Sequence, residues 1–452
     1  MNISDLSFNH QVLKIEREQL FDEGRDISEE VEEEFDTLEP LYVDEDPSAQ
    51  TRVQVLLDIV SGLPVRPDYP YEEPSDLEGI RAARQEGTRR FSTPLDGAAL
   101  YDRIYGAWLG RCSGCLLGKP IEGWLSDRLW PYLKETGNFP LRDYLRSDVP
   151  DSVAEKYQVS RERAYIDRVS HMVEDDDTNY TVTALAVLDK HGLAFNAESV
   201  GLFWLANLPM LHTFTAERIA YRNLANLIPP PNSASYRNPY REWIGAQIRA
   251  DFWGYAAVGN PELAAELAWR DASVSHVKNG IYGEMWVAAM LAAAPFARDL
   301  RDVIELGLRE IPENSRLFEN IQQVIQWHER GAGYDEAVTE LHKIWNEASP
   351  HHWCHTISNA QIVAIGLLWG EGDFEKSICR AVQACFDTDC NGATVGSIIG
   401  MMHGAKALPS KWIDPLNDEL ETGISGFHFV KISDLARKTV ELQDMVRKGW
   451  SD

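Results

Sequence analysis

The chain has 452 residues, of which 44% are hydrophobic and 14 are tryptophan, enough to bury a large core. Its formal net charge of −28 argues against nucleic acid as a partner, because phosphate binding relies on patches of Lys and Arg. The start MNISDLSFNH resembles no secretory signal, no window approaches a transmembrane helix, and the six cysteines form no disulfide framework. We therefore expect a cytoplasmic protein with no membrane partner.

Residues 1–96 are expected to form an acidic, partly extended N-terminal extension. Residues 1–50 hold 16 acidic and 3 basic residues, and the glutamate run over 29–34 is typical of a solvated or partly disordered segment. Residues 51–63 have the pattern of a short amphipathic helix. Residues 66–76, rich in proline and tyrosine, are expected to run extended along the main domain.

Helical patterns dominate from residue 97, where we expect one all-α domain that continues to residue 452. Two helical segments carry glycine at every fourth position, which places the glycines along one helix face. Glycine costs a helix interior about 0.5–1 kcal/mol relative to alanine, so a compensating contact is needed. We therefore expect two buried helices whose backbones nearly touch. The glycines are Gly106, Gly110, Gly114 and Gly118 in the first segment and Gly392, Gly396, Gly400 and Gly404 in the second.

Two aspartate clusters precede helical segments that are expected to begin near Thr178 and at residue 391. A helix N-terminus stabilises carboxylates and fixes their direction. Carboxylates that converge repel one another, and Mg²⁺ or Mn²⁺ would relieve the repulsion because these ions prefer oxygen ligands. The clusters therefore predict a cup that binds divalent cations, and the number of carboxylates fits a pair of ions. Its carboxylates are Asp175, Asp176, Asp177, Asp387 and Asp389.

The other helical patterns complete the all-α prediction, since strict alternation over the length of a strand is scarce. One long loop, residues 228–243, is rich in Pro, Ser and Asn and is of the kind that lines sites. The further helical patterns cover residues 180–192, 260–270, 280–294, 374–386 and 430–449.

Two other patterns raise the question of zinc. Cys112 and Cys115 form a CxxC pair inside the first glycine-rich segment, but no second pair has zinc-ribbon spacing, so small buried thiols are favoured. His351, His352 and His355 form the cluster HHWCH. No acid or cysteine outside that cluster is spaced to complete a tetrahedral site. Packing histidines, or a His355 that contacts substrate, remain the alternatives.

Three motifs resemble those of the ADP-ribosylglycohydrolase family, in family order, over about residues 97–410. They are GAWLGRCSGCLLGKPIEGW, DDDTNYT and FDTDCNGATVGSIIGMMHG. The resemblance implies an all-α orthogonal helical bundle with a metal-lined cleft that holds two Mg²⁺ ions, with Mn²⁺ as the alternative metal. It also implies hydrolysis of the glycosidic bond at ribose C1 of an ADP-ribosylated small molecule or protein.

The resemblance assigns roles to individual residues. Glu122 matches the glutamate near the metals and the anomeric carbon, and Asp177 and Asp387 are expected to act with it in catalysis. The metal ligands implied are Asp175, Asp176, Asp177, Asp387, Asp389 and Cys390. Candidate substrate contacts are Lys119, His355, Asn391 and Tyr180.

Three departures from the family pattern leave alternative hypotheses about the metal site and the function open. Asp175 stands where the family has a threonine or serine. Cys390 replaces a threonine ligand, and Cys115 replaces an aspartate. The sequence therefore does not decide whether the site holds one metal ion or two. A neutral thiol is a poor Mg²⁺ ligand. Alternatives to the ADP-ribosyl hydrolase are a hydrolase of a non-ADP N-riboside or nucleoside, and a non-catalytic ADP-ribose-binding or structural homologue.

Substrate choice is expected to depend on the loops around the cup, over residues 123–170 and 228–243. A pyrophosphate needs cationic or N–H donors, and Lys119, Arg237 and Arg241 could supply them. Trp124, Tyr180 and Trp243 could stack on a ring, although buried aromatic residues more often belong to a core. The segment around His276 could lie near the pocket or pack in the core.

Overall fold

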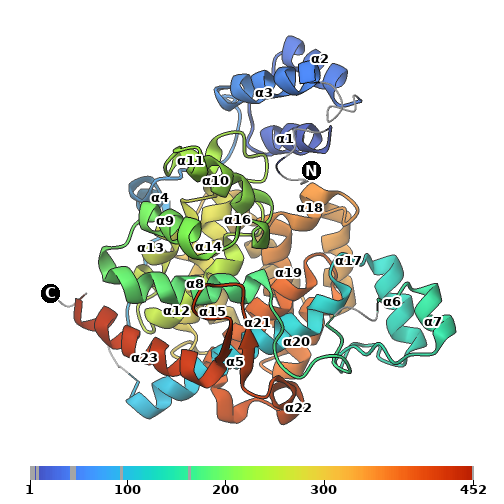
Figure 1. Cartoon of the computed structure of the whole chain (residues 1–452), viewed down its shortest axis with the longest axis vertical. Coiled ribbons are helices and arrows are strands. Elements are labelled where there is room, and N and C mark those ends of the chain that lie inside the picture. The colour runs from blue at the N-terminus through green and yellow to red at the C-terminus, as the bar shows by residue number, and fades with distance from the viewer. Residues whose placement is uncertain (1–5, 7–9, 41–46, 92–94, 161–163, 450–452) are drawn as a thin grey trace.

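The computed structural model of the chain describes residues 6, 10–40, 47–91, 95–160 and 164–449, and its regular structure is almost wholly helical (Figure 1). The predicted all-α class is confirmed. The strands of the described residues are β1 (Glu419–Glu421) and β2 (Phe429–Lys431), which pair antiparallel with Glu419 opposite Lys431. Across these described ranges, no helix is both long and apolar enough to cross a membrane.

The N-terminal segment is more helical than its composition suggested. Figure 1 shows its first three helices gathered at one end of the molecule, beside α18. The glutamate run over 29–34 is solvated but helical, because Phe35 and Leu38 are buried and anchor one face of its helix. The helices are α1 (His10–Asp22), α2 (Glu29–Leu38), α3 (Pro47–Ser61) and α4 (Leu77–Ala83).

Residues 66–76 run largely extended along the main domain, as predicted. The backbone N–H of Glu72 donates to the carbonyl of Asn314 at 2.8 Å. The indole N–H of Trp269 donates to the carbonyl of Ser75 at 2.9 Å, and the hydroxyl of Tyr282 donates to the carbonyl of Pro74. These contacts fasten the second half of the stretch to the domain.

The two glycine-rich segments form α5 (Gly97–Gly118) and α21 (Thr388–His403), which pack closely as predicted. The structure shows that the two helices run antiparallel. A Cβ atom at Gly110 or Gly114 would lie closer than 3 Å to the backbone carbonyl of Gly396 or Gly392 respectively. Only glycine therefore allows this backbone contact. The antiparallel arrangement brings the C-terminus of α5 to the N-terminus of α21, where the Thr388 hydroxyl donates to the carbonyl of Gly118 at 3.0 Å.

The remaining helices surround this pair. The first group is α6 (Ser126–Glu135), α7 (Asp151–Lys156), α8 (Asp176–His191), α9 (Ala197–Asn207), α10 (Thr215–Ala225), α11 (Asn232–Ser235), α12 (Asp251–Ala256), α13 (Pro261–Ala272) and α14 (Lys278–Ala293). The second group is α15 (Leu300–Leu308), α16 (Arg316–Glu329), α17 (Tyr334–Ile344), α18 (Pro350–Cys354), α19 (Thr356–Gly370), α20 (Phe374–Gln383), α22 (Ser410–Ile413) and α23 (Ile432–Gly449). Short 3₁₀ turns are η3 (Lys119–Ile121), η4 (Gly192–Ala194), η5 (Met210–His212), η6 (Gln247–Arg249), η7 (Ala405–Ala407) and η8 (Asp414–Leu416).

Candidate active site

The first aspartate cluster forms the N-terminus of α8. The helix begins at Asp176, two residues before the predicted start, because Asp175 is its N-cap and accepts from the backbone N–H of Asp177 at 2.9 Å. A carboxylate is a favoured cap, and two more in the first turn interact favourably with the positive end of the helix dipole. All three side chains are thus held at one helix end.

The second cluster forms the N-terminus of α21. This helix begins at Thr388, three residues before the predicted start, with Asp387 as its N-cap and Asp389 in its first turn. The backbone N–H of Asp387 donates to the side-chain oxygen of Asn359 at 3.2 Å, and the Asn391 amide donates to the same oxygen at 2.8 Å. Asn359, which sequence reasoning did not single out, therefore fixes the start of α21.

The fold brings both clusters together, as the sequence predicted. Ligand atoms of Cys115, Asp175, Asp177 and Asp389 lie within 4.8 Å of one another, and so do those of Asp387, Asp389 and Cys390. Two buried carboxylate oxygens, Asp177 Oδ2 and Asp389 Oδ1, have no hydrogen-bond partner among the described residues. A buried, unpartnered carboxylate oxygen is costly, so this donor set fits divalent cations.

Two basic side chains offset part of the negative charge. Arg111 is fully buried, donates to Asp177 Oδ1 at 2.9 Å and forms an ion pair with Asp251 at 2.8 Å. Lys119 forms an ion pair with Asp175 at 2.5 Å. Arg111 was missed in the sequence, although a lone arginine among buried glycines and apolar residues of α5 was a signal for it.

The pKa values of the carboxylates show how crowded the site is. The negative charge of Asp389, together with those of Asp175 and Asp176, raises the pKa of Glu122 above its usual range, although the Glu122 side chain is exposed. Burial and neighbouring carboxylates likewise raise the pKa of Asp176 and of Asp387. Asp175 is the exception: burial works to raise its pKa, but the charge and hydrogen bond of Lys119, together with the hydrogen bond from the Asp177 N–H, hold the pKa of Asp175 below its usual value. Bound cations would remove this repulsion.

The acidic cluster opens into a cavity of about 470 Å³. Much of its wall comes from residues 211–217, 244–248 and 353–354 rather than from the loops 123–170 and 228–243. The lining residues are Lys119, Glu122, Glu174, Asp175, Asp176, Asn179, Leu211, His212, Phe214, Thr215, Glu217, Ile244, Gly245, Ile248, Trp353, Cys354, Asp387, Asp389 and Cys390.

Comparisons with known proteins show the family to which the chain belongs. The family model described as ADP-ribosylglycohydrolase matches residues 96–448. The chain belongs to the ADP-ribosylglycohydrolase family. A solved structure described as an ADP-ribosylglycohydrolase-related protein complex is 19% identical, with a TM-score of 0.49, and the match covers 77% of this chain and 99% of that one. A search of curated proteins found no match.

Membership of the ADP-ribosylglycohydrolase family supports a glycohydrolase activity. The family is metal-dependent, and the acidic groups at the starts of α8 and α21 could bind metal ions. Seven of the residues predicted for the site line the cavity together. They are Lys119, Glu122, Asp175, Asp176, Asp387, Asp389 and Cys390.

Four other predicted residues are not among the described residues that line the cavity. Asp177 is fully buried behind it, where its side chain joins the carboxylate cluster. Tyr180 is buried against the ring of Trp204, with ring centroids 5.9 Å apart, and belongs to the core. Asn391 is buried and its amide donates to the side-chain oxygen of Asn359. The His355 ring stacks on the Trp345 ring, with ring centroids 5.7 Å apart.

The thiols of the site remain protonated. Burial, together with the nearby carboxylates, raises the pKa of Cys115 and of Cys390 well above the usual range. Cys112 is buried on the same helix, and no zinc-binding pair forms there in the described part of the chain. Neutral thiols are weak ligands for hard cations, so the carboxylates carry the metal-binding capacity.

Other aromatic and histidine candidates take structural positions. Trp124 is buried beneath the Arg128 guanidinium, 3.7 Å from its ring, and Trp243 is buried and donates to His351. His276 is buried at the margin of a separate cavity of about 790 Å³.

Proposed function

We propose that the chain is a metal-dependent hydrolase that cleaves the glycosidic bond at ribose C1 of an ADP-ribosylated substrate, with Mg²⁺ or Mn²⁺ as the metal. The observation that carries this proposal is the meeting of two helix-capping aspartate clusters at one cavity, with two buried carboxylate oxygens left unpartnered among the described residues. Family membership supports the same reaction class.

In this proposal Asp175, Asp176, Asp177, Asp387 and Asp389 hold the metal. Two Mg²⁺ ions bound there would supply positive charge that orients the ribose hydroxyls. Asp177 is held in place by Arg111, and Asp387 by the backbone hydrogen bond to Asn359.

Glu122 is the proposed general acid or base. It lines the cavity beside the carboxylate cluster, and the charge of Asp389 raises its pKa. Bound cations would offset the charge of Asp389, so the role of Glu122 rests on its place in the cavity wall. There its carboxyl group would donate a proton to the leaving group. In the reverse role its carboxylate would accept a proton from the attacking water.

A second substrate class has an observation of its own. Lys119 is the only lysine or arginine among the described lining residues, and it is paired with Asp175. Arg237 and Arg241, expected as pyrophosphate partners, instead bind Asp58 and Glu16 of the N-terminal segment. A cavity wall with few cationic side chains favours an N-riboside without a pyrophosphate as the alternative substrate.

The experiment is a hydrolysis assay with Mg²⁺ on ADP-ribosyl-arginine, ADP-ribosyl-serine and uncharged N-ribosides. Turnover of an ADP-ribosyl compound, lost in Asp176→Ala and kept in the surface variant Asp143→Ala, supports the proposal. Turnover of the uncharged N-ribosides alone would show that the substrate is an N-riboside without a pyrophosphate. Metal binding with no turnover of any compound would contradict the enzyme and favour a binding protein.

A further inference from the structure

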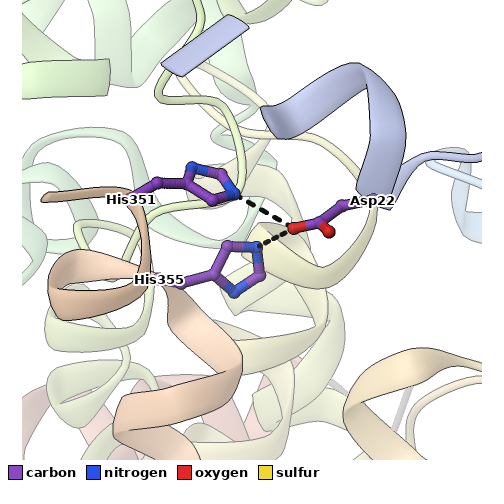
Figure 2. Close-up of side chains that lie close together, drawn as sticks. All are labelled: Asp22, His351 and His355. Atoms are coloured by element: carbon purple, nitrogen blue, oxygen red, sulfur yellow. Dashed lines mark hydrogen bonds and ion pairs between the residues drawn. The ribbon is translucent and has the colours of Figure 1, made fainter. Parts of the chain in front are cut away.

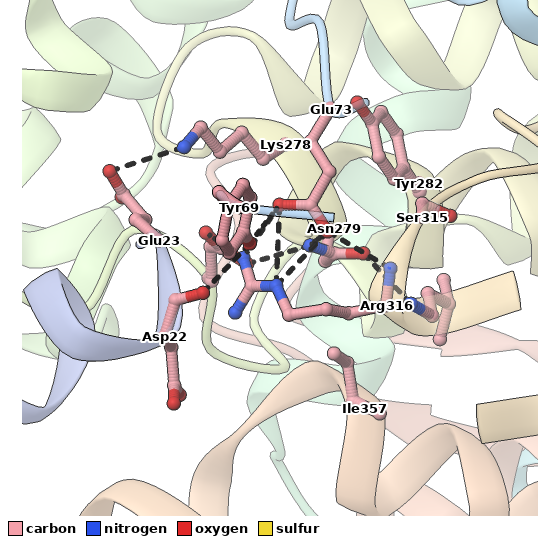
Figure 3. A network of polar contacts seen from close by, with 12 residues as sticks. Asp22, Glu23, Tyr69, Glu73, Lys278, Asn279, Tyr282, Ser315, Arg316 and Ile357 are labelled. Carbon is pink, nitrogen blue, oxygen red and sulfur yellow. Dashed lines mark hydrogen bonds and ion pairs between the residues drawn. The ribbon is translucent and has the colours of Figure 1, made fainter. Parts of the chain in front are cut away.

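The N-terminal segment docks on the catalytic domain through buried ion pairs, made by α1 and by the extended stretch 66–76. Arg241 binds Glu16 and Glu23, each at 2.7 Å. Arg316 binds Glu73 at 2.9 Å, and Figure 3 shows this pair among the polar residues around it. Glu16, Glu23 and Arg316 are all less than 9% exposed. The docking is therefore specific, because each buried charge needs its partner.

The same interface contains Asp22, at the end of α1, facing two histidines of the catalytic domain (Figure 2). His351 Nε2 lies 3.0 Å from Asp22 Oδ2, and His355 Nε2 lies 4.0 Å from the same oxygen. Both imidazoles are buried, and His355 Nε2 has no hydrogen-bond partner in the described chain.

Hydrogen bonds to the other ring nitrogens fix the tautomers. The Trp243 indole N–H donates to His351 Nδ1 at 3.1 Å, and the Ile357 backbone N–H donates to His355 Nδ1 at 3.1 Å. Neither donor can accept, so the proton of each neutral ring lies on Nε2 and points toward Asp22. A metal ion would need a lone pair at those same atoms. Ligand atoms of Asp22, His351 and His355 lie close enough together for a metal ion, but with both Nε2 atoms protonated the two histidines face a carboxylate instead.

The histidines connect Asp22 with the catalytic cavity. They flank Trp353 and Cys354, which line the cavity. Asn359, one turn after His355, donates to the carbonyls of Trp353 at 2.9 Å and of His355 at 3.0 Å.

The other end of the Asn359 amide reaches the proposed metal ligands. Its oxygen accepts from the backbone N–H of Asp387 and from the Asn391 amide. Both donors and both acceptor positions of Asn359 are thus used, and its side chain is fully buried. Any shift of the α18–α19 junction would move the start of α21.

We propose that Asp22 is a positioning residue for the metal site, so that the N-terminal helices complete the catalytic domain from outside the family match. Asp22 holds His351 through a hydrogen bond and faces the Nε2 of His355. His351 and His355 fix the α18–α19 junction, and Asn359 transmits that position to Asp387. The inference rests on the proposed metal centre.

The test is calorimetric titration of the full-length protein with Mn²⁺, at a temperature where every variant is fully folded. Asp22→Ala is expected to weaken Mn²⁺ binding about tenfold, as is common when a residue that supports a metal ligand is lost. Asp22→Asn keeps an acceptor oxygen and is expected to retain the affinity within about threefold. Arg52→Ala, which breaks a surface ion pair with Glu34 in the same N-terminal helices, is the matched control and should bind like the wild type.

Hydrogen exchange of the metal-free protein gives a second readout. Amides over residues 351–359 are expected to exchange faster in Asp22→Ala than in Arg52→Ala. If Asp22→Ala does not fold, His351→Phe removes the donor at similar ring size and should show the same loss of affinity. Wild-type affinity in Asp22→Ala or in a folded His351→Phe would overturn the inference while leaving the metal centre intact. Failure of the wild type to bind Mn²⁺ would overturn both.

Discussion

The glycine-packed helix pair and the N-terminal interface are both buried contacts between distant segments, yet only the first was predicted. In α5 and α21 each glycine recurs every four residues, so the contact is encoded within two short stretches. At the N-terminal interface single residues meet across the chain, as Asp22 meets His351. A contact made by periodically spaced residues can be predicted from the sequence, whereas a contact between isolated charged residues cannot.

The largest expected effect falls on the N-terminal interface. Arg241→Met would leave Glu16 and Glu23 buried without their cation. Removing one partner of a buried ion pair costs roughly 3–5 kcal/mol of folding free energy. Urea unfolding should show this loss, while Arg298→Met, whose side chain is 79% exposed, should change stability little. Equal stability of the two variants would show that the interface is dispensable for folding.

The glycine pair should respond nearly as strongly. Gly114→Ala places a Cβ against the backbone carbonyl of Gly392, where neither helix can yield easily. We expect a loss of about 3 kcal/mol in unfolding free energy. Gly97→Ala at the start of the same helix meets nothing within 4 Å and should be neutral or stabilise by up to about 0.5 kcal/mol. A tolerated Gly114→Ala would mean that the helices can separate.

A smaller effect is expected from pH at Asp22. Burial works to raise the pKa of Asp22, but the hydrogen bond from His351 and nearby positive charge outweigh it and lower the pKa from 3.8 to about 2. A lowered folded-state pKa contributes stability above the unfolded-state pKa, and that stability is lost as pH falls toward 2.

The predicted contribution of this carboxylate is about 2 kcal/mol at pH 5. The wild type should therefore be more stable than Asp22→Asn by about that amount at pH 5, and the gap should close between about pH 4 and pH 2. Paired urea titrations across this range provide the measurement. A gap that does not change with pH would contradict the carboxylate–histidine contact.

The site residues divide in the same way into those that short sequence motifs reveal and those that depend on distant contacts. The aspartate clusters were found because they are short motifs beside helices, whereas Glu122 was found through the family resemblance. The structure places Glu122 and four of the five aspartates in the wall of one cavity. Both helix starts were placed two or three residues late, since the capping residues are themselves the aspartates.

What could not be predicted depended on orientation or on long-range pairing. Tyr180 was expected to contact substrate, but whether it faces the cavity or the core depends on packing, and it faces the core. Asn359 supports Asp387 from another helix, and nothing near the aspartates in sequence points to it. Arg111 supports Asp177, and the only sign of it was a lone arginine in the glycine-rich segment, which does not reveal its partner.

The most direct measurement is calorimetric titration of the wild type and Asp387→Ala with Mg²⁺, together with thermal unfolding of each metal-free protein. Removing one carboxylate from a crowded acidic site relieves repulsion, so metal-free Asp387→Ala should be at least as stable as the wild type. Its Mg²⁺ binding and Mg²⁺-dependent stabilisation should be abolished. Full Mg²⁺-dependent stabilisation of Asp387→Ala would contradict the assignment of the metal site.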